Sequence, residues 1–369
     1  MKKRFAALLL AGTLAMSTLA GCGGLEDSDV MATVGKEEIT GNVANFFARY
    51  QQAMYEATYS SMLGDNMWET QIEAGKSYEE TTKKNIMQSL EELYLIDQHK
   101  EDYNVSLTDE EKKKISDAAD AFVKGNSEEA REMISGDKET IEKILTLLTV
   151  QNKMQPEMIK DVDQNVSDEE AAQKKMQYVY FLYSKDASSE DSSAEGETDT
   201  DTKDEAKTKA DAFLKAVKEG KDFSASAEEQ GATASELTFD SSSQSLDEKV
   251  IKAADALKAG EMTDVIETDT GFYVARLTSD FDREATDSKK QQIIDQREQD
   301  RYDELLKEWK EDTEIKEYEK EWKKIDFVKQ GVNVKAAETT EDTSENTEET
   351  TEENTEDTTQ ENSENTDAE

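Results

Sequence analysis

The side chains that could carry out covalent or metal chemistry are few in this sequence. It contains one cysteine, Cys22, and one histidine, His99. A single histidine excludes a histidine-rich zinc site, and His99 stands in a charged helical segment where a solvated position is expected. Adjacent acids such as Asp109 and Glu110 stand at an expected helix start, where negative charge favours the helix dipole. No EF-hand spacing occurs, so we expect neither a metal site nor a cofactor.

Cys22 ends a segment that is typical of an export signal. Three basic residues, Lys2-Lys3-Arg4, precede an apolar run over residues 5–16 that is too short for a permanent membrane span. The following Leu19-Ala20-Gly21-Cys22 is similar to the lipobox of bacterial lipoproteins. The resemblance implies cleavage before Cys22, lipidation of its sulfur, and an extracytoplasmic protein anchored to the outer face of the cell membrane. An ordinary signal peptide that happens to end in cysteine is the alternative.

Composition narrows the function classes further. The 369 residues include 87 acidic and 44 basic side chains, a formal net charge of -43. A protein that binds nucleic acid needs positive charge to contact the phosphates, so no nucleic-acid partner is expected. Charge also cannot hold this chain to an anionic membrane, which leaves the lipid as the anchor.

The first half of the sequence has the periodicity of a helical domain. Residues 30–40 predict a short strand, a turn and a helix start, and apolar side chains then recur at helical spacing. Thr108–Glu111 reads TDEE and Ser167–Glu170 reads SDEE, which are capping boxes that open helices. Pro156 is interpreted as a helix breaker followed by a restart. Further helices are expected over residues 78–100 and 138–154.

The second half mixes strands with helices and ends in acidic low-complexity sequence. Residues 186–205 and the tail are rich in Ser, Thr and acids, and cannot bury a core, so both are expected to be disordered. Apolar and β-branched runs predict strands, and Ala-rich amphipathic runs predict helices. The expected strands cover residues 177–184, 265–268 and 271–277, and the expected helices cover 206–219, 250–257 and 287–324.

Several segments of the second half resemble a parvulin-type peptidyl-prolyl isomerase domain. AADALKAGEMTDVIETDTGFYVARL, residues 253–277, follows the family's run of helix end, Thr-bearing strand and Gly-aromatic strand. EGKDFSASAEEQ, residues 219–230, resembles the family's entry into a helix, and YFLYSK, residues 180–185, stands at its first strand. VMATVGKEEIT, residues 30–40, resembles the start of the amino-terminal chaperone domain of secreted foldases.

The order of these parts resembles the PrsA-type foldase lipoproteins. The resemblance implies an α+β protein in which a helical chaperone domain, completed by a C-terminal helix, carries an inserted parvulin-like α/β domain and disordered acidic segments. The expected division is a signal peptide at 1–21, a linker at 22–29, the helical domain at 30–175, the parvulin-like domain at 176–280 with the acidic insert 186–205, the C-terminal helix region at 281–334 and the acidic tail at 335–369.

The parvulin-like segment departs from its family at the catalytic positions. The family's two facing histidines are absent, and Tyr180 and Tyr273 stand at those positions. GATASELTFDSSS, residues 231–243, replaces the family's glycine-rich loop, and Val250 replaces a usual Phe. Tyrosines offer hydrogen-bond donors and aromatic surface but lack the acceptor and tautomer behaviour of an imidazole. We therefore expect weak or no isomerase activity, with Tyr180 and Tyr273 filling the core of a degenerate fold.

The expected partners are unfolded or newly exported polypeptides. Methionine-rich and aromatic surfaces adapt to varied apolar partners, although a plain core is an equal interpretation of such residues here. A homodimer is left open. The candidate client-binding residues are Phe46, Phe47, Tyr50, Met54, Phe239 and Val250.

Three rival functions remain. An active prolyl isomerase would need a histidine-free site, and a proline-limited refolding assay distinguishes it. A solute-binding lipoprotein would need repeated strand–helix units forming two α/β lobes, against which the helical first half argues. A purely structural envelope protein is the third, and the sequence alone does not separate it from a chaperone.

Overall fold

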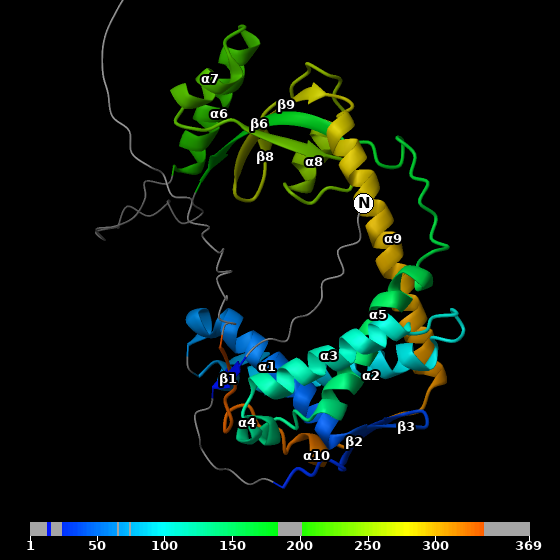
Figure 1. Cartoon of the computed structure of the whole chain (residues 1–369). Helices are drawn as coiled ribbons and strands as arrows, with labels where there is room; N and C mark the ends of the chain where they lie inside the picture. The colour runs from blue at the N-terminus through cyan, green and yellow to red at the C-terminus, as the bar shows by residue number, and fades with distance from the viewer. Residues whose placement is uncertain (1–12, 16–23, 65, 74, 184–200, 336–369) are drawn as a thin grey trace, which may run out of the picture.

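Two bodies joined by one long helix make up the molecule (Figure 1). The computed structural model describes residues 13–15, 24–64, 66–73, 75–183 and 201–335. The predicted lipidation site Cys22, the expected acidic insert up to residue 200 and the acidic tail from residue 336 lie outside them. The expectation of disorder is wrong for residues 201–205, because Thr202 and Glu205 form a capping box that begins helix α6 (Lys203–Lys218). Helices and strands are both present, so the expected α+β fold class is confirmed.

The larger body is mainly helical and takes residues from both ends of the described chain. A three-stranded antiparallel sheet in the order β10-β2-β3 lies beside the helices. One core cluster combines buried side chains from Met31 to Met158 with Leu305, Leu306, Trp309, Ile325 and Phe327. Its elements are β2 (Val30–Val34), β3 (Glu37–Thr40), α1 (Gly41–Leu63), a 3-10 turn (Met67–Glu69), β4 (Gln71–Glu73), β5 (Lys76–Ser77), α2 (Tyr78–Gln98), α3 (Asp109–Gly125), α4 (Glu128–Met133), α5 (Lys138–Met158), β10 (Ile315–Glu317) and α10 (Glu319–Trp322).

Local sequence signals fix where several of these helices begin. Thr108 and Glu111 form a complete capping box at α3, as predicted, and Ser77 and Glu80 form another at α2. Each box satisfies a backbone N–H at the helix start that would otherwise lack a partner.

The smaller body is built on a four-stranded antiparallel sheet in the order β7-β6-β9-β8. One face packs against α6 and α7 through Val179, Phe181 and Phe213. The other face packs against α8 through Met176 and Ile251. The elements are β6 (Lys174–Leu182), α6 (Lys203–Lys218), α7 (Phe223–Glu229), β7 (Ser235–Phe239), α8 (Glu248–Asp255), β8 (Ile266–Glu267) and β9 (Gly271–Ser279).

Helix α9 (Arg283–Asp312) connects the two bodies, and no residue between Thr286 and Leu305 is buried. Three cations of α9, Arg283, Lys290 and Arg297, recur every seven residues. They hold the chain segment that leads into β6. Arg283 and Lys290 bind Asp168 at 2.6 and 2.5 Å, and Arg297 binds Glu170 at 2.6 Å. Helix α9 and the segment that leads into β6 therefore run side by side between the two bodies.

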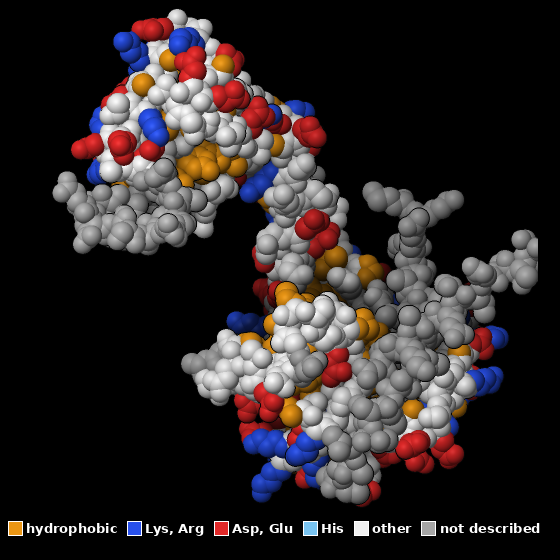
Figure 2. All heavy atoms as spheres, turned by 90° about the vertical axis from the view of Figure 1, so that its left-hand side faces the viewer, with side chains coloured by type: hydrophobic (Ala, Val, Ile, Leu, Met, Phe, Trp, Pro, Cys, Tyr) orange, Lys and Arg blue, Asp and Glu red, His pale blue; other side chains and the backbone are white. Residues whose placement is uncertain are grey.

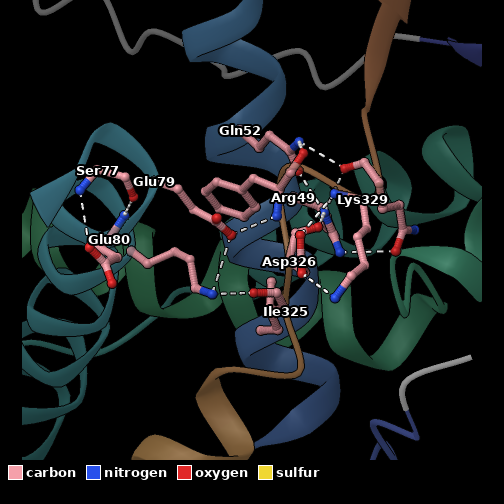
Figure 3. Close-up of polar contacts among 11 residues, drawn as sticks. Arg49, Gln52, Ser77, Glu79, Glu80, Ile325, Asp326 and Lys329 are labelled. Atoms are coloured by element: carbon pink, nitrogen blue, oxygen red, sulfur yellow. Dashed lines mark hydrogen bonds and ion pairs between the residues drawn. The ribbon is translucent and has the colours of Figure 1, made fainter. Parts of the chain in front are cut away.

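The segment after α10 is clamped onto α1 and α2 (Figure 3). The buried guanidinium of Arg49 donates to the carbonyls of Asp326 and Gln330 at 3.1 and 2.9 Å, and to the Gln330 side chain at 2.9 Å. Lys83 donates to the carbonyl of Ile325, and the backbone N–H of Phe327 donates to Glu79 at 2.7 Å. The Phe327 ring is buried against Trp68, with 4.9 Å between ring centroids.

Three expectations about the elements are wrong. The helix expected over residues 287–324 ends at Asp312 and is followed by β10 and α10, since Ile315 pairs with Val34 at the edge of the sheet. Pro156 lies inside α5 and does not break it, because in the last turn its missing N–H removes only one hydrogen bond.

The SDEE segment also opens no helix. Glu170 donates its backbone N–H to Ser167 as a capping box requires, but the acidic side chains of Asp168 and Glu170 are bound by the cations of α9. The turn is therefore held as part of the connection between the two bodies.

The expected linker at 22–29 is not a free spacer over its described residues. Leu25 packs against the core of the larger body, and Asp27 and Asp29 bind Ser135 and Lys324. A further pairing joins β1 (Thr13–Ala15) to β11 (Asn333–Lys335). Because β1 lies in the expected signal peptide, this pairing belongs to the uncleaved chain.

We expect a large loss of stability when the guanidinium of Arg49, which holds residues 326 and 330 against α1, is removed. Arg49→Met leaves the Asp326 carbonyl and the side-chain amide oxygens of Gln52 and Gln330 without their donor, and we expect a cost of about 3 kcal/mol in the free energy of unfolding. Arg49→Lys should rescue little, because an ammonium cannot reproduce the planar fork. The chain's three tryptophans are Trp68, Trp309 and Trp322, so tryptophan fluorescence during urea unfolding reports on the larger body. A cost below about 1 kcal/mol would contradict the clamp.

Because the carboxyl of Glu91 is buried, we expect the larger body to lose stability as the pH rises. It is 5% exposed, one carboxylate oxygen has no partner, and burial followed by the charge of Glu317 raises its pKa from 4.5 to about 7. Between these values the folded carboxyl keeps a proton that the unfolded one has lost, so stability falls from about pH 4.5 to 7 and is level above. Glu91→Gln should therefore stabilise the chain by about 2 kcal/mol at pH 8 and little at pH 4.5. If Glu91→Gln changed the free energy of unfolding equally at pH 8 and pH 4.5, the raised pKa of Glu91 would be refuted.

Candidate functional site

Three tyrosines form an open aromatic face on the sheet of the smaller body. Tyr180 in β6 lies directly opposite Tyr273 in β9, with ring centroids 5.9 Å apart. Tyr178 lies 6.4 Å from each of these rings, also by centroids. Alternation along a strand places Tyr178, Tyr180 and Leu182 on one face. We call these four residues, Tyr178, Tyr180, Leu182 and Tyr273, the tyrosine face.

The tyrosine face is accessible to solvent. Tyr180 is 41% exposed and Leu182 is 49% exposed, while Tyr178 and Tyr273 are half-buried. Figure 2 shows hydrophobic side chains gathered on the surface of the smaller body. The expectation that Tyr180 and Tyr273 fill a core is therefore wrong, because the core residues Phe181, Phe272 and Val274 point to the opposite side of the same strands.

The chemistry available at this face is that of neutral phenols. Partial burial raises the pKa of Tyr273, so its hydroxyl stays protonated and serves as a donor. His99, the only histidine, lies in the other body, with its ring stacked on Trp309 at 4.2 Å between centroids and its Nδ1 2.8 Å from Asp102. The face thus offers aromatic surface and hydroxyl donors, without an imidazole.

Two candidate residues of the smaller body lie beneath its surface. Phe239 and Val250 are both 0% exposed, and Phe239 belongs to the cluster that packs α8 on the sheet. A client could not reach either side chain in this conformation. Packing of α8, rather than client contact, accounts for their apolar character.

A second apolar surface lies at the end of α1. Helix α1 projects past its last buried residue, Ala53, so that side chains on several sides of it are open. We call this surface the α1 tip and define it by five exposed side chains. They are Met54 (46% exposed), Tyr59 (37%), Met62 (72%), Leu63 (38%) and the neighbouring Ile72 (49%).

Aromatic packing fixes the base of the α1 tip. Tyr55 lies 5.9 Å from Tyr59 and 6.3 Å from Trp68, and Trp68 stacks on Tyr78 at 5.4 Å, all between ring centroids. The indole of Trp68 donates to Glu56 at 2.8 Å. Glu56 is the only charged residue in α1 after Arg49. The tip is thus a rigid and almost uncharged surface.

The four candidate client-binding residues of α1 differ in how far they are exposed. Phe46 and Phe47 are buried in the core of the larger body, at 2% and 4% exposure, so their client contact is corrected to a packing role. Tyr50 is half-buried, and Met54 is exposed at the α1 tip. For Tyr50 and Met54 a binding role stays a prediction.

Sequence reasoning missed Tyr178, Leu182 and Ile72 as surface residues. A signal existed for the first two, because in QYVYFLYS they share the two-residue period of Tyr180. Nothing in the sequence placed Ile72 beside the end of α1. Within the described residues no group of three or more His, Cys, Asp or Glu side chains could hold a metal ion, and no helix is long and apolar enough to cross a membrane.

Comparison with known proteins finds related sequences. A PPIC-type PPIase domain model matches residues 192–286, a range that contains Tyr273 and begins after Tyr180. The chain is 27% identical over 261 residues to the foldase protein PrsA of Clostridium botulinum, which covers 66% of this chain and 76% of that protein.

Solved PrsA structures are also similar. The foldase protein PrsA from Lactococcus lactis has 15% identity and a TM-score of 0.34, covering 79% of this chain and 96% of that one. The peptidylprolyl isomerase PrsA from Bacillus cereus has 16% identity and a TM-score of 0.30, covering 81% and 98%. The sequence comparisons confirm the resemblance to PrsA-type foldases, and the chain carries a PPIC-type PPIase domain at residues 192–286.

Proposed function

We propose that this chain is a lipid-anchored, extracytoplasmic foldase that holds unfolded or newly exported polypeptides on apolar surfaces of its two bodies. The observation that carries the proposal is the α1 tip. It exposes Met54, Met62 and Tyr59 on a nearly uncharged helix end, in a chain whose formal net charge is -43. The similarity to PrsA foldases supports it.

The composition of the α1 tip suits an unfolded client. Methionine is unbranched and polarizable, so a methionine surface adapts to varied apolar side chains. Tyrosine adds a large contact area at a low cost in conformational entropy. Exposed apolar side chains that cluster in this way mark interaction sites on soluble proteins.

The tyrosine face serves as a second contact surface. Stacked aromatic rings on the face of β6 and β9 offer apolar area to a chain segment, and the phenol hydroxyls offer donors to its carbonyl groups. Rotation about a prolyl bond has a barrier of about 18–20 kcal/mol, and catalysis requires tighter binding of the twisted amide than of either planar form. Without imidazoles we assign the face mainly to binding.

The net charge complements these surfaces. A polyanionic body repels its own copies while it holds an apolar client, which keeps the complex soluble. Basic segments of an emerging client are attracted over a range set by the Debye length, about 8–10 Å at physiological salt. We assign the membrane attachment to acylation at Cys22.

Aggregation of a denatured client tests the holding function. The mature chain should suppress it without ATP, and Met62→Glu should weaken the suppression about fivefold in the concentration required, which corresponds to about 1 kcal/mol at a contact surface. Light scattering measures the effect. Ser224→Glu adds the same charge at an exposed position in α7 and should leave the suppression unchanged. If a large molar excess of the parent chain leaves aggregation untouched, the holding function is wrong.

Proline-limited refolding of a model protein tests the second candidate, an active isomerase, which the match to a PPIC-type domain favours. We expect the mature chain to accelerate this refolding little or not at all, because no imidazole lies near Tyr180 or Tyr273. Tyr180→Phe and Tyr273→Phe should then leave the refolding rate unchanged. A strong acceleration that Tyr273→Phe abolishes would instead establish a histidine-free isomerase.

A further inference from the structure

The chain enters the folded larger body almost directly after the predicted lipidation site. Leu25, three residues beyond Cys22, packs against the core. The carboxylate of Asp27 accepts a hydrogen bond from Ser135 at 2.7 Å, and Asp29 pairs with Lys324 at 2.7 Å. The acidic residues of this segment are thus used as contacts to the larger body.

Backbone contacts fix the same segment to the start of α1. The N–H groups of Gly41 and Asn42 donate to the carbonyls of Asp29 and Asp27 at 2.7 and 3.1 Å. A Cβ atom at Gly41 would lie 2.2 Å from the carbonyl oxygen of Glu26, so the close approach requires glycine there. Residues 25–29 are therefore an integral part of the fold.

The remaining tether is short. Three residues of fully extended chain span at most about 11 Å. A folded body held this closely to an acylated cysteine cannot tumble freely above the lipid. The end of the body that carries residues 25–29 must face the headgroups.

We propose that the larger body stands on the membrane by the end formed by residues 25–29 and α10, and that it holds the smaller body at the membrane-distal end. This rests on the proposed acylation of Cys22. Figure 1 shows the described chain resuming after residue 23, in blue, beside α10 and β2, at the end of the molecule opposite the sheet of β6 and β9. Helix α9 connects the two bodies between these ends.

The surface around α10 is suited to headgroups. From Lys316 to Lys329 the sequence has five lysines and four acids, whereas the whole chain has 44 basic and 87 acidic residues. Lys320 and Lys323 are exposed, and Lys324 binds Asp29 next to the tether. Together with Glu26, Asp27 and Asp29, this end has five lysines and seven acids, so it is less acidic than the chain as a whole and an anionic lipid surface repels it less.

The orientation also places both apolar surfaces away from the lipid. Helix α1 starts beside the tether at Gly41, and its 23 residues extend about 35 Å to the α1 tip. The tyrosine face lies in the smaller body, beyond α9. A client would therefore be held above the headgroups and between the two bodies rather than against the bilayer.

Energy transfer between single protein probes and labelled lipid tests this orientation. Acylation leaves the mature chain with no free thiol, because Cys22 is its only cysteine, so one engineered cysteine can be labelled selectively. Glu319→Cys places a dye at the start of α10, and Glu228→Cys places one on exposed α7 in the smaller body. The lipidated chain is reconstituted in phosphatidylcholine and phosphatidylglycerol vesicles that contain an acceptor lipid.

We expect high transfer from residue 319 and low transfer from residue 228. A Gly-Ser linker inserted between Gly24 and Leu25 should reduce this difference, because a longer tether frees the body. Equal transfer from the two probes on an acylated, vesicle-bound chain would overturn the orientation and leave the anchor standing. An unchanged difference after the insertion would overturn the role of the tether. A chain whose Cys22 thiol stays free and that does not float with vesicles would overturn both anchor and orientation.

Discussion

The architecture depends on the attachment of the segment after α10 to helices α1 and α2. Arg49 is 3% exposed, and burial lowers its pKa to about 10, which still leaves it charged at neutral pH. A charge taken out of water is tolerated when most of its donors are bound, and here the backbone carbonyls of residues 326 and 330 and the side chains of Gln52 and Gln330 accept from its two terminal nitrogens, while Nε has no partner. The cation on α1 thereby fixes a segment that is 277 residues away in sequence. Phe327 adds apolar contact at the same place.

The smaller body is an insertion with two connections, because α9 returns to the larger body and buries Leu305, Leu306 and Trp309 in its core. The segment leading into β6 and helix α9 both run between the bodies, and the cations Arg283, Lys290 and Arg297 hold them together. Such exposed ion pairs contribute little individually, but they share partners along one helix and act as a network.

Charge and apolar surface are divided between different parts of the molecule. Asp29 and Glu111 of the larger body are bound by lysines, and Asp168 of the connection is bound by Arg283 and Lys290. Most of the exposed large apolar residues lie at the end of α1 and on the tyrosine face, and Phe281 and Val328 lie elsewhere. A foldase needs both properties, because the charge keeps the loaded protein in solution while the apolar surfaces bind chains of unrelated sequence.

The sequence by itself determined the elements whose signals are local. The capping box at Thr108 begins α3 where predicted, and the strand and helix runs of the second half lie within a few residues of β6, α6, α8 and β9. The order of those parts also identified the resemblance to PrsA-type foldases, which the comparisons support. These features depend on neighbours along the chain, so they are readable from it.

Only the tertiary structure decided which apolar residues are surface and which are core. Phe46, Phe47, Phe239 and Val250 have the same hydrophobic character as Met54 and Met62, yet the first four pack inside and the last two project from the end of α1. The sides taken by Tyr180 and Phe181 depend on which face of the sheet α6 and α7 cover. The burial of residues 25–29, and with it the short tether, depends on contacts with Ser135 and Lys324. Such contacts join residues far apart in sequence, and no local pattern encodes them.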